Sequence, residues 1–194
     1  MARDAGHQGY LCGLDPAPGM IEQARKHDNI HWVLGDISTV TWEDRFDLVV
    51  MTGHAFQVLV TDSEVRHALG AIPRVLTEDG HFMFETRNPR VREWEDWTPS
   101  RVSGVTTETG AVVLMHNCVE EPVESDVVSF TTTFESPDWP EPRVSHSTLR
   151  FLDVDQLASF LSDAGLVIEE QFGDFDHETL TEACPEIITI ARPL

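Results

Sequence analysis

Two aspartates stand directly after short apolar segments near the start of the chain. Asp15 follows the segment 10–14, and Asp36 follows the segment 30–34. If both segments are parallel strands of a doubly wound sheet, their carboxyl ends meet at the edge where such sheets bind ligands. One carboxylate can accept hydrogen bonds from both hydroxyls of a ribose, and the other from the exocyclic amine of adenine. The pair therefore predicts a nucleoside-binding edge, with a simple turn role as the alternative because Asp is also a common turn residue.

The segments around these aspartates alternate between strand and helix patterns. Apolar residues at helical spacing in 20–24 predict a short helix between the two strands. The near-continuous apolar run 46–52 is typical of a strand that is covered on both faces. A capped apolar stripe over 62–76 predicts a helix, and 80–86 a further strand. This alternation predicts an α/β fold with right-handed crossovers.

The middle of the chain lacks helical periodicity and shows successive strand patterns. We expect four antiparallel strands there, over 102–109, 111–120, 125–135 and 143–151. The α/β pattern then resumes with a helix that Asp153 caps, followed by strands over 166–172 and 186–191. The sequence is therefore predicted to form one domain, 1–194, in which residues 97–150 form a β-rich insertion that covers the substrate as a lid.

The composition restricts the classes of partner. Thirteen basic residues stand against 34 acidic ones, which gives a formal net charge of −21. Because nucleic acid and anionic membrane surfaces repel such a chain, neither is expected as a partner. No apolar run reaches the length of about 18 residues that a membrane span needs, and no signal-peptide pattern is visible. We therefore expect a cytoplasmic protein, and the spacing of its cysteines and histidines predicts no metal site.

Four segments carry a family resemblance. They are GLDPAPGM at 13–20 with Ala24-Arg25, LGDI at 34–37, FDLVVMTGHAFQ at 46–57 and LTEDGHFMFET at 76–86. In order and spacing they resemble the class I S-adenosylmethionine (SAM)-dependent methyltransferases, specifically the small-molecule type with a β-rich insertion. The resemblance implies a Rossmann-like methyltransferase sheet, SAM as the cofactor and a small molecule as the substrate.

The resemblance also implies roles for the matching residues on the nucleoside side. Asp15 would bind the ribose hydroxyls, and Met20 would pack on the face of the adenine. Asp36 would accept a hydrogen bond from the adenine amine, while the backbone N–H of Ile37 would meet a ring nitrogen.

On the methionine side of the cofactor, Thr52, Gly53 and His54 would line the floor of the pocket. His54 follows a strand end where the methyl group is expected, so it is the candidate general base. The alternative is a histidine that only forms part of the pocket wall. Glu85 and Arg87, at the end of the next strand, could also face the substrate.

The sequence departs from the family at its start. The family begins with a strand, a glycine-rich loop and a helix, and nothing before Asp15 corresponds to the strand and the loop. In the family that strand lies between the strand ending at Asp15 and the strand ending at Thr52. We therefore expect an N-terminally truncated methyltransferase sheet without its first strand. Either the native protein is longer, or another chain fills the gap.

Three functions remain open at this point. The first is methyl transfer from SAM to nitrogen or oxygen of a small molecule, by a monomer or a homodimer. The second is a catalytically inactive methyltransferase-like protein with weak or no cofactor binding, which the absent glycine-rich loop favours. The third is a dehydrogenase-like nucleotide binder. The acidic motif at 34–37 and the antiparallel strands expected at the end of the sheet argue against this third function.

Overall fold

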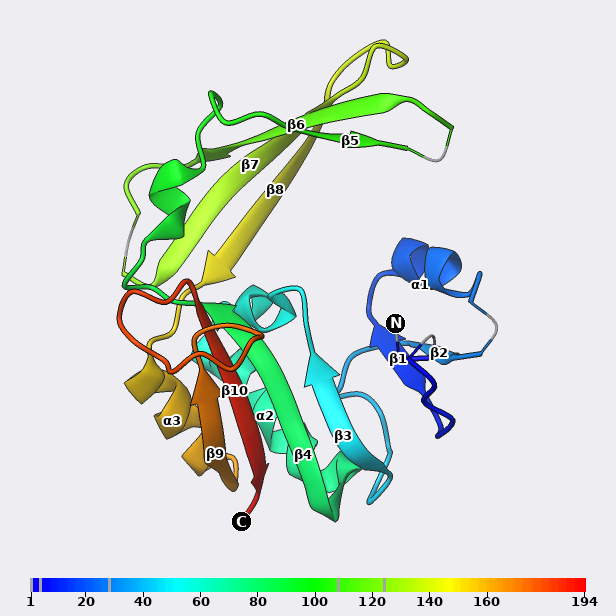
Figure 1. Cartoon of the computed structure of the whole chain (residues 1–194), viewed down its shortest axis with the longest axis vertical. Helices are drawn as coiled ribbons and strands as arrows, with labels where there is room; N and C mark the ends of the chain where they lie inside the picture. The colour runs from blue at the N-terminus through cyan, green and yellow to red at the C-terminus, as the bar shows by residue number, and fades with distance from the viewer. Residues whose placement is uncertain (1, 4, 28, 108, 124) are drawn as a thin grey trace.

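The computed structural model describes residues 2–3, 5–27, 29–107, 109–123 and 125–194. Its strands form three sheets: a parallel pair, a four-stranded mixed sheet and a four-stranded antiparallel sheet (Figure 1). The mixed sheet carries helices, as an α/β fold requires, so the predicted Rossmann-like fold class is confirmed. No helix in the described part of the chain is long and apolar enough to cross a membrane.

The parallel pair contains both acidic strand ends. Its elements are β1 (Cys12–Asp15), α1 (Pro18–Ala24) and β2 (His31–Leu34). Gly13 lies against the ring of Trp32 on the neighbouring strand so closely that a Cβ on Gly13 would come within 2.0 Å of the ring. A side chain at this position would therefore require the Trp32 ring to move.

The mixed sheet has the strand order β3-β4-β10-β9. Its elements are β3 (Phe46–Met51), α2 (Asp62–Val75), β4 (Leu76–Arg87), α3 (Val154–Asp163), β9 (Leu166–Phe172) and β10 (Glu186–Pro193), with a short 3-10 helix at Ala55–Val58. β3 runs parallel to β4, whereas β10 runs antiparallel to both of its neighbours. Capping boxes begin both long helices, at Thr61 and at Asp153.

One face of the mixed sheet holds the main core. Buried apolar side chains from the sheet, α2 and α3 meet there, including Val65, Leu69, Phe82, Phe84 and Leu157. Val49 and Met51 of β3 pack against this cluster.

On the opposite face of β3, Leu48 and Val50 are 55% and 53% exposed. The prediction that this strand is covered on both faces is therefore wrong for the described residues. The apolar run results from one buried face together with one open apolar face.

The parallel pair and the mixed sheet are not joined by a hydrogen-bonded ladder among the described residues. They touch through side chains instead. Tyr10 stacks on Phe46 with ring centroids 6.2 Å apart, and the guanidinium of Arg45 lies 4.9 Å from the centre of the Tyr10 ring. Figure 1 shows β1 standing apart from the outer edge of β3. The expectation that a further strand belongs between them stays a prediction.

The insertion forms the antiparallel sheet, with strands β5 (Ser103–Thr106), β6 (Val112–Val119), β7 (Val127–Glu135) and β8 (Arg143–Arg150) in sequence order. The strand expected over 102–109 is shorter in the structure, and its residue 108 lies outside the described residues. Before β5, the chain forms a 3-10 helix at Glu93–Asp96, whose Trp94 packs on Phe151. This small second core anchors the base of the insertion.

Arg150 connects the insertion to the rest of the domain. It ends β8 and forms ion pairs with Asp126 at 2.9 Å and with Asp62, at the start of α2, at 2.8 Å. Its guanidinium also lies 5.6 Å from the ring centre of Phe160 in α3. The side chain thus bridges the antiparallel sheet and both long helices.

Candidate functional site

Asp15 ends β1 and begins the turn that leads into α1. Its Oδ1 accepts a hydrogen bond of 2.8 Å from the backbone N–H of Ala17, the N-cap residue of the helix. The structure therefore gives Asp15 the turn role that we weighed as the alternative. Its second oxygen makes no hydrogen bond within the described part of the chain, so one acceptor remains for a ligand.

Asp36 has the same arrangement after β2. Its Oδ1 accepts hydrogen bonds from the backbone N–H of Ser38 at 2.8 Å and from the Ser38 hydroxyl at 2.5 Å. The hydroxyl hydrogen bond, as the largest cause, holds the pKa of the Asp36 carboxyl below its usual value. The group is thus an ionised acceptor whose orientation is fixed by the turn. Ile37, the next residue, is partly buried against the main core.

The other predicted cofactor residues are accessible. Met20 lies on α1 and is 60% exposed, whereas its neighbour Ile21 is buried. Thr52 and Gly53 follow β3 and are exposed, with Gly53 at a φ of 71° that favours glycine.

The residues present fit the nucleoside half of SAM. Two oriented carboxylates supply hydrogen-bond acceptors at adjacent ends of parallel strands, and Met20 supplies an apolar surface. Asp15 and Asp36 share one sheet, while Thr52 and Gly53 follow a strand of another sheet. The structure therefore places Asp15 and Asp36 in one sheet. Among the described residues, no strand-to-strand hydrogen bonds connect this sheet to the one that leads into Thr52 and Gly53.

His54 is held by two glutamates from different strands. Its backbone N–H donates to Oε1 of Glu85 at 2.9 Å, and its ring Nε2 lies 3.0 and 3.1 Å from the two carboxylate oxygens of Glu186. The residue has a φ of 57°, which is uncommon for a side chain other than glycine. Strained conformations of this kind persist where the surroundings fix them and are frequent at functional sites.

Glu186 is the partner that reasoning from the sequence missed. It begins β10, and the antiparallel register places it opposite Arg87 of β4. The same register places Ile188 opposite Glu85, so Glu85, Arg87 and Glu186 share one face at one end of the sheet. The available signal was an acidic residue at the start of the last strand. Its position beside His54 becomes evident only from the pairing of β10 with β4.

Arg87 is already paired within the protein. Its guanidinium lies 3.1 Å from Oε1 of Gln57, 3.0 Å from Oε2 of Glu93 and 5.2 Å from the ring centre of Trp97. Gln57 is fully buried, and its amide donates to the carbonyl oxygen of Arg150 at 3.1 Å. Arg87 therefore helps to join β4 to the base of the insertion.

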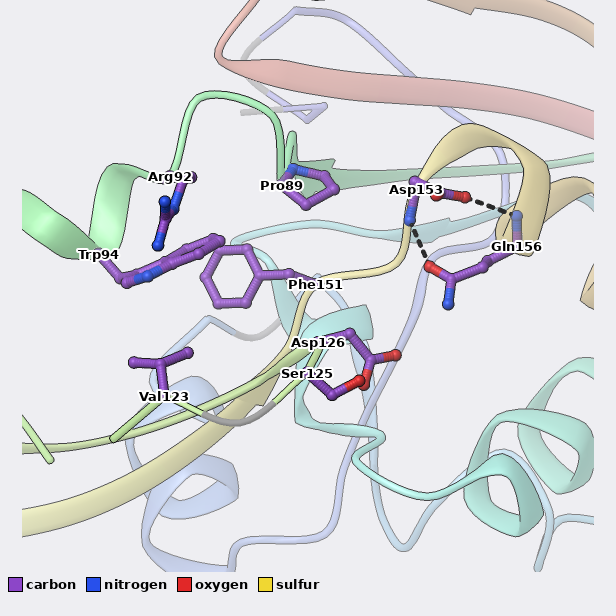
Figure 2. Close-up of a pocket in the computed structure, with 9 residues that line it drawn as sticks. All are labelled: Pro89, Arg92, Trp94, Val123, Ser125, Asp126, Phe151, Asp153 and Gln156. Atoms are coloured by element: carbon purple, nitrogen blue, oxygen red, sulfur yellow. Dashed lines mark hydrogen bonds between the residues drawn. The ribbon is translucent and has the colours of Figure 1, made fainter. Parts of the chain in front are cut away.

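A cavity of about 400 Å³ lies away from all of these residues (Figure 2). Its lining comes from the second core and the start of α3, and includes Trp94, Phe151 and Asp153. Asp153 and Gln156 are engaged in the helix capping box, as the dashed lines in Figure 2 show. A second cavity of about 340 Å³ is also lined by Asp153 but by none of the predicted site residues.

Comparisons with known proteins point to one family. Residues 1–80 match the family model described as a methyltransferase domain. Nodulation protein S of Rhizobium tropici is 30% identical over 95 residues, a match that covers 46% of this chain and 40% of that protein. The matched region is thus less than half of the length of this curated relative.

Solved structures share the fold. An S-adenosylmethionine-dependent methyltransferase from Clostridium acetobutylicum superposes with a TM-score of 0.76 at 14% identity, over 95% of this chain and 75% of that chain. The CcbJ methyltransferase from Streptomyces caelestis gives 0.75 at 19% identity, over 98% and 76%. SAM-bound CalS10, an amino pentose methyltransferase from Micromonospora echinaspora, gives 0.70 at 20% identity, over 98% and 77%.

The fold is Rossmann-like, and the carboxyl ends of its parallel pair β1 and β2 carry the two acidic residues Asp15 and Asp36. Residues 1–80 match a methyltransferase domain, and the whole chain shares its fold with solved SAM-dependent methyltransferases. This match and the shared fold agree with the family and the cofactor that the sequence motifs imply.

Proposed function

We propose that this chain transfers a methyl group from SAM to a nitrogen or oxygen atom of a small molecule. The observation that carries the proposal is the pair of oriented carboxylates, Asp15 and Asp36, at adjacent strand ends of a methyltransferase fold. Among the structural relatives, CalS10 is described as an amino pentose methyltransferase and KedS8 as a sugar N-methyltransferase. These relatives support a small-molecule acceptor. A cytoplasmic location and a homodimer remain parts of the proposal.

Each residue of the site would have a defined task. Asp15 and Asp36 would bind the ribose and the adenine, with Met20 on the adenine face. Thr52 and Gly53 would line the methionine end. When bound, SAM supplies an electrophilic methyl group on a sulfonium, so much of the rate can come from the positioning of the acceptor.

His54 is proposed as the general base. Its Nε2 faces the carboxylate of Glu186, which can only accept a hydrogen bond when it is ionised. The proton of a neutral imidazole is therefore assigned to Nε2, and Nδ1 remains free to take a proton from the acceptor. In this arrangement Glu186 is a positioning residue that fixes the tautomer of His54.

A methyl-transfer assay tests the base. Formation of S-adenosylhomocysteine would be followed with the native enzyme, with His54→Ala and with Glu186→Gln across pH. We expect His54→Ala to slow transfer by about a hundredfold or more, as loss of a general base does. We expect Glu186→Gln to shift the pH–rate profile while it retains part of the rate. A His54→Ala enzyme at full rate would remove His54 from catalysis.

A second candidate function follows from the separation of β1 from β3, which no ladder among the described residues bridges. This separation favours a methyltransferase-like protein that binds its cofactor weakly and does not catalyse transfer. Titration of SAM into the 194-residue chain distinguishes the two functions, because the first requires saturable binding and the second does not.

A further inference from the structure

Glu85 is a buried carboxylate without an ion-pair partner among the residues that the structure describes. Its residue is 3% exposed, and its Oε2 is a buried oxygen that has no hydrogen-bond partner among the described residues. No ion pair in the described part of the chain includes it, since the nearby guanidinium of Arg87 pairs with Glu93. A buried carboxyl oxygen without a partner is costly, and such groups gather at sites where a ligand or a reaction uses them.

The contacts of Glu85 place it beside His54. Its other oxygen, Oε1, accepts the backbone N–H of His54, the residue proposed as the base. Glu186 approaches the ring of the same histidine and shares the sheet face with Glu85. Two carboxylates therefore flank His54. Within the described part of the chain, both oxygens of Glu186 have a partner, whereas Oε2 of Glu85 has none.

We propose that Glu85 binds the ammonium group of a primary or secondary amine, and that this amine is the methyl acceptor. This inference rests on the proposed methyltransferase function. An ammonium group would supply both the missing positive charge and the missing hydrogen-bond donor for Oε2. A neutral alcohol would supply only a donor, and it would leave the buried charge uncompensated.

The chemistry balances with residues already described. The bound ammonium gives one proton to Nδ1 of His54, which frees the lone pair on its nitrogen. That nitrogen then attacks the methyl carbon of SAM, and the carbon–sulfur bond breaks with its electron pair left on sulfur. The new N–methyl product is again a cation, and the proton on His54 passes to solvent.

The experiment measures binding of the amine without the cofactor, so that it is independent of methyl transfer. Cyclohexylamine and cyclohexanol serve as a matched cation and neutral probe. Each is titrated into the ¹⁵N-labelled chain, and the backbone amide of His54 is followed by NMR because it donates to Glu85. Glu85→Gln removes the charge, and Glu170→Gln is the control. Glu170 lies at an exposed position of β9 in the same sheet, outside the cluster.

We expect a saturable shift of the His54 amide with cyclohexylamine in the millimolar range, and at least a tenfold weaker response with cyclohexanol. Glu85→Gln should lose the response to the amine, and Glu170→Gln should retain it. Because Glu85→Gln removes an unpaired buried charge, its melting temperature should equal or exceed that of the native chain. An unfolded Glu85→Gln protein would show that the carboxylate supports the fold and would overturn the inference.

Equal responses to the two probes, no response to either, or a response that survives Glu85→Gln would each overturn the inference as well. Failure of the proposed function has a different signature, because it appears as absent SAM binding or absent transfer. If SAM binds and an alcohol is methylated while the amine does not bind, the function stands and the acceptor class assigned here is wrong.

Discussion

Replacing Arg150 with alanine should destabilise the domain far more than the same change at Arg66. Both guanidinium groups lie over the Phe160 ring, at 5.6 Å for Arg150 and 5.0 Å for Arg66, and each pairs with aspartate. They differ in burial. The Arg150 side chain is 12% exposed and its partner Asp126 is 20% exposed, whereas Arg66 and its partner are both about half exposed.

The magnitude follows from that difference in burial. A hydrogen bond between charged groups in the partly buried Asp126 pair contributes about 1.5–3 kcal/mol. The pair with Asp62 contributes at most about 1 kcal/mol, because Asp62 is largely exposed. Arg150→Ala should therefore cost about 2–4 kcal/mol, which corresponds to a fall of roughly 4–16 °C in Tm for a domain of this size. Arg66→Ala should cost no more than about 1 kcal/mol.

Thermal unfolding followed by circular dichroism, with urea unfolding for the free energy, measures both variants. The m-value should stay unchanged, since the same surface is exposed on unfolding. Equal falls in Tm for Arg150→Ala and Arg66→Ala would refute the reasoning, because burial would then not decide the strength of these ion pairs.

Three further perturbations test other parts of the structure. Because the Ser38 hydroxyl lowers the pKa of Asp36 in the folded state, the ionised carboxyl stabilises the fold above its unfolded pKa, and this stabilisation is lost as the pH falls through the folded pKa. Ser38→Ala should raise the Asp36 pKa in an NMR titration, and an unchanged value would contradict this cause. Gly13→Ala should destabilise by about 1–3 kcal/mol in urea, because its Cβ would overlap Trp32; a neutral result would mean that the ring moves freely. Val50→Lys should change stability by less than about 0.5 kcal/mol, because Val50 is exposed; a large loss would show that another segment or chain covers this face.

Local sequence signals were sufficient for most of the elements. The acid-terminated strands before Asp15 and Asp36 and the helix capped by Asp153 all occur where the patterns placed them. These features depend on neighbouring residues, such as the capping box between Asp153 and Gln156. They can therefore be predicted from a single sequence.

Features that depend on distant strands were not predictable. The pairing of Glu186 with His54 requires β10 to lie beside β4. The hydrogen bond from the buried Gln57 amide to the carbonyl oxygen of Arg150 requires the end of β8 to lie next to Gln57. The open face of β3 was also missed, because Leu48 and Val50 are as apolar as the residues that face the core. Hydrophobicity alone does not show which face of a strand is covered.

Asp15 and Asp36 are proposed to hold the nucleoside half of SAM. Calorimetric titration of the 194-residue chain with SAM and with adenosine, each repeated on Asp15→Ala, tests it most directly. We expect both ligands to bind and to compete for one site. We also expect Asp15→Ala to weaken both by about ten- to a hundredfold, as for one lost hydrogen bond to a charged group. Absence of binding by either ligand, or affinities that Asp15→Ala leaves unchanged, would show that the two aspartates do not hold the nucleoside.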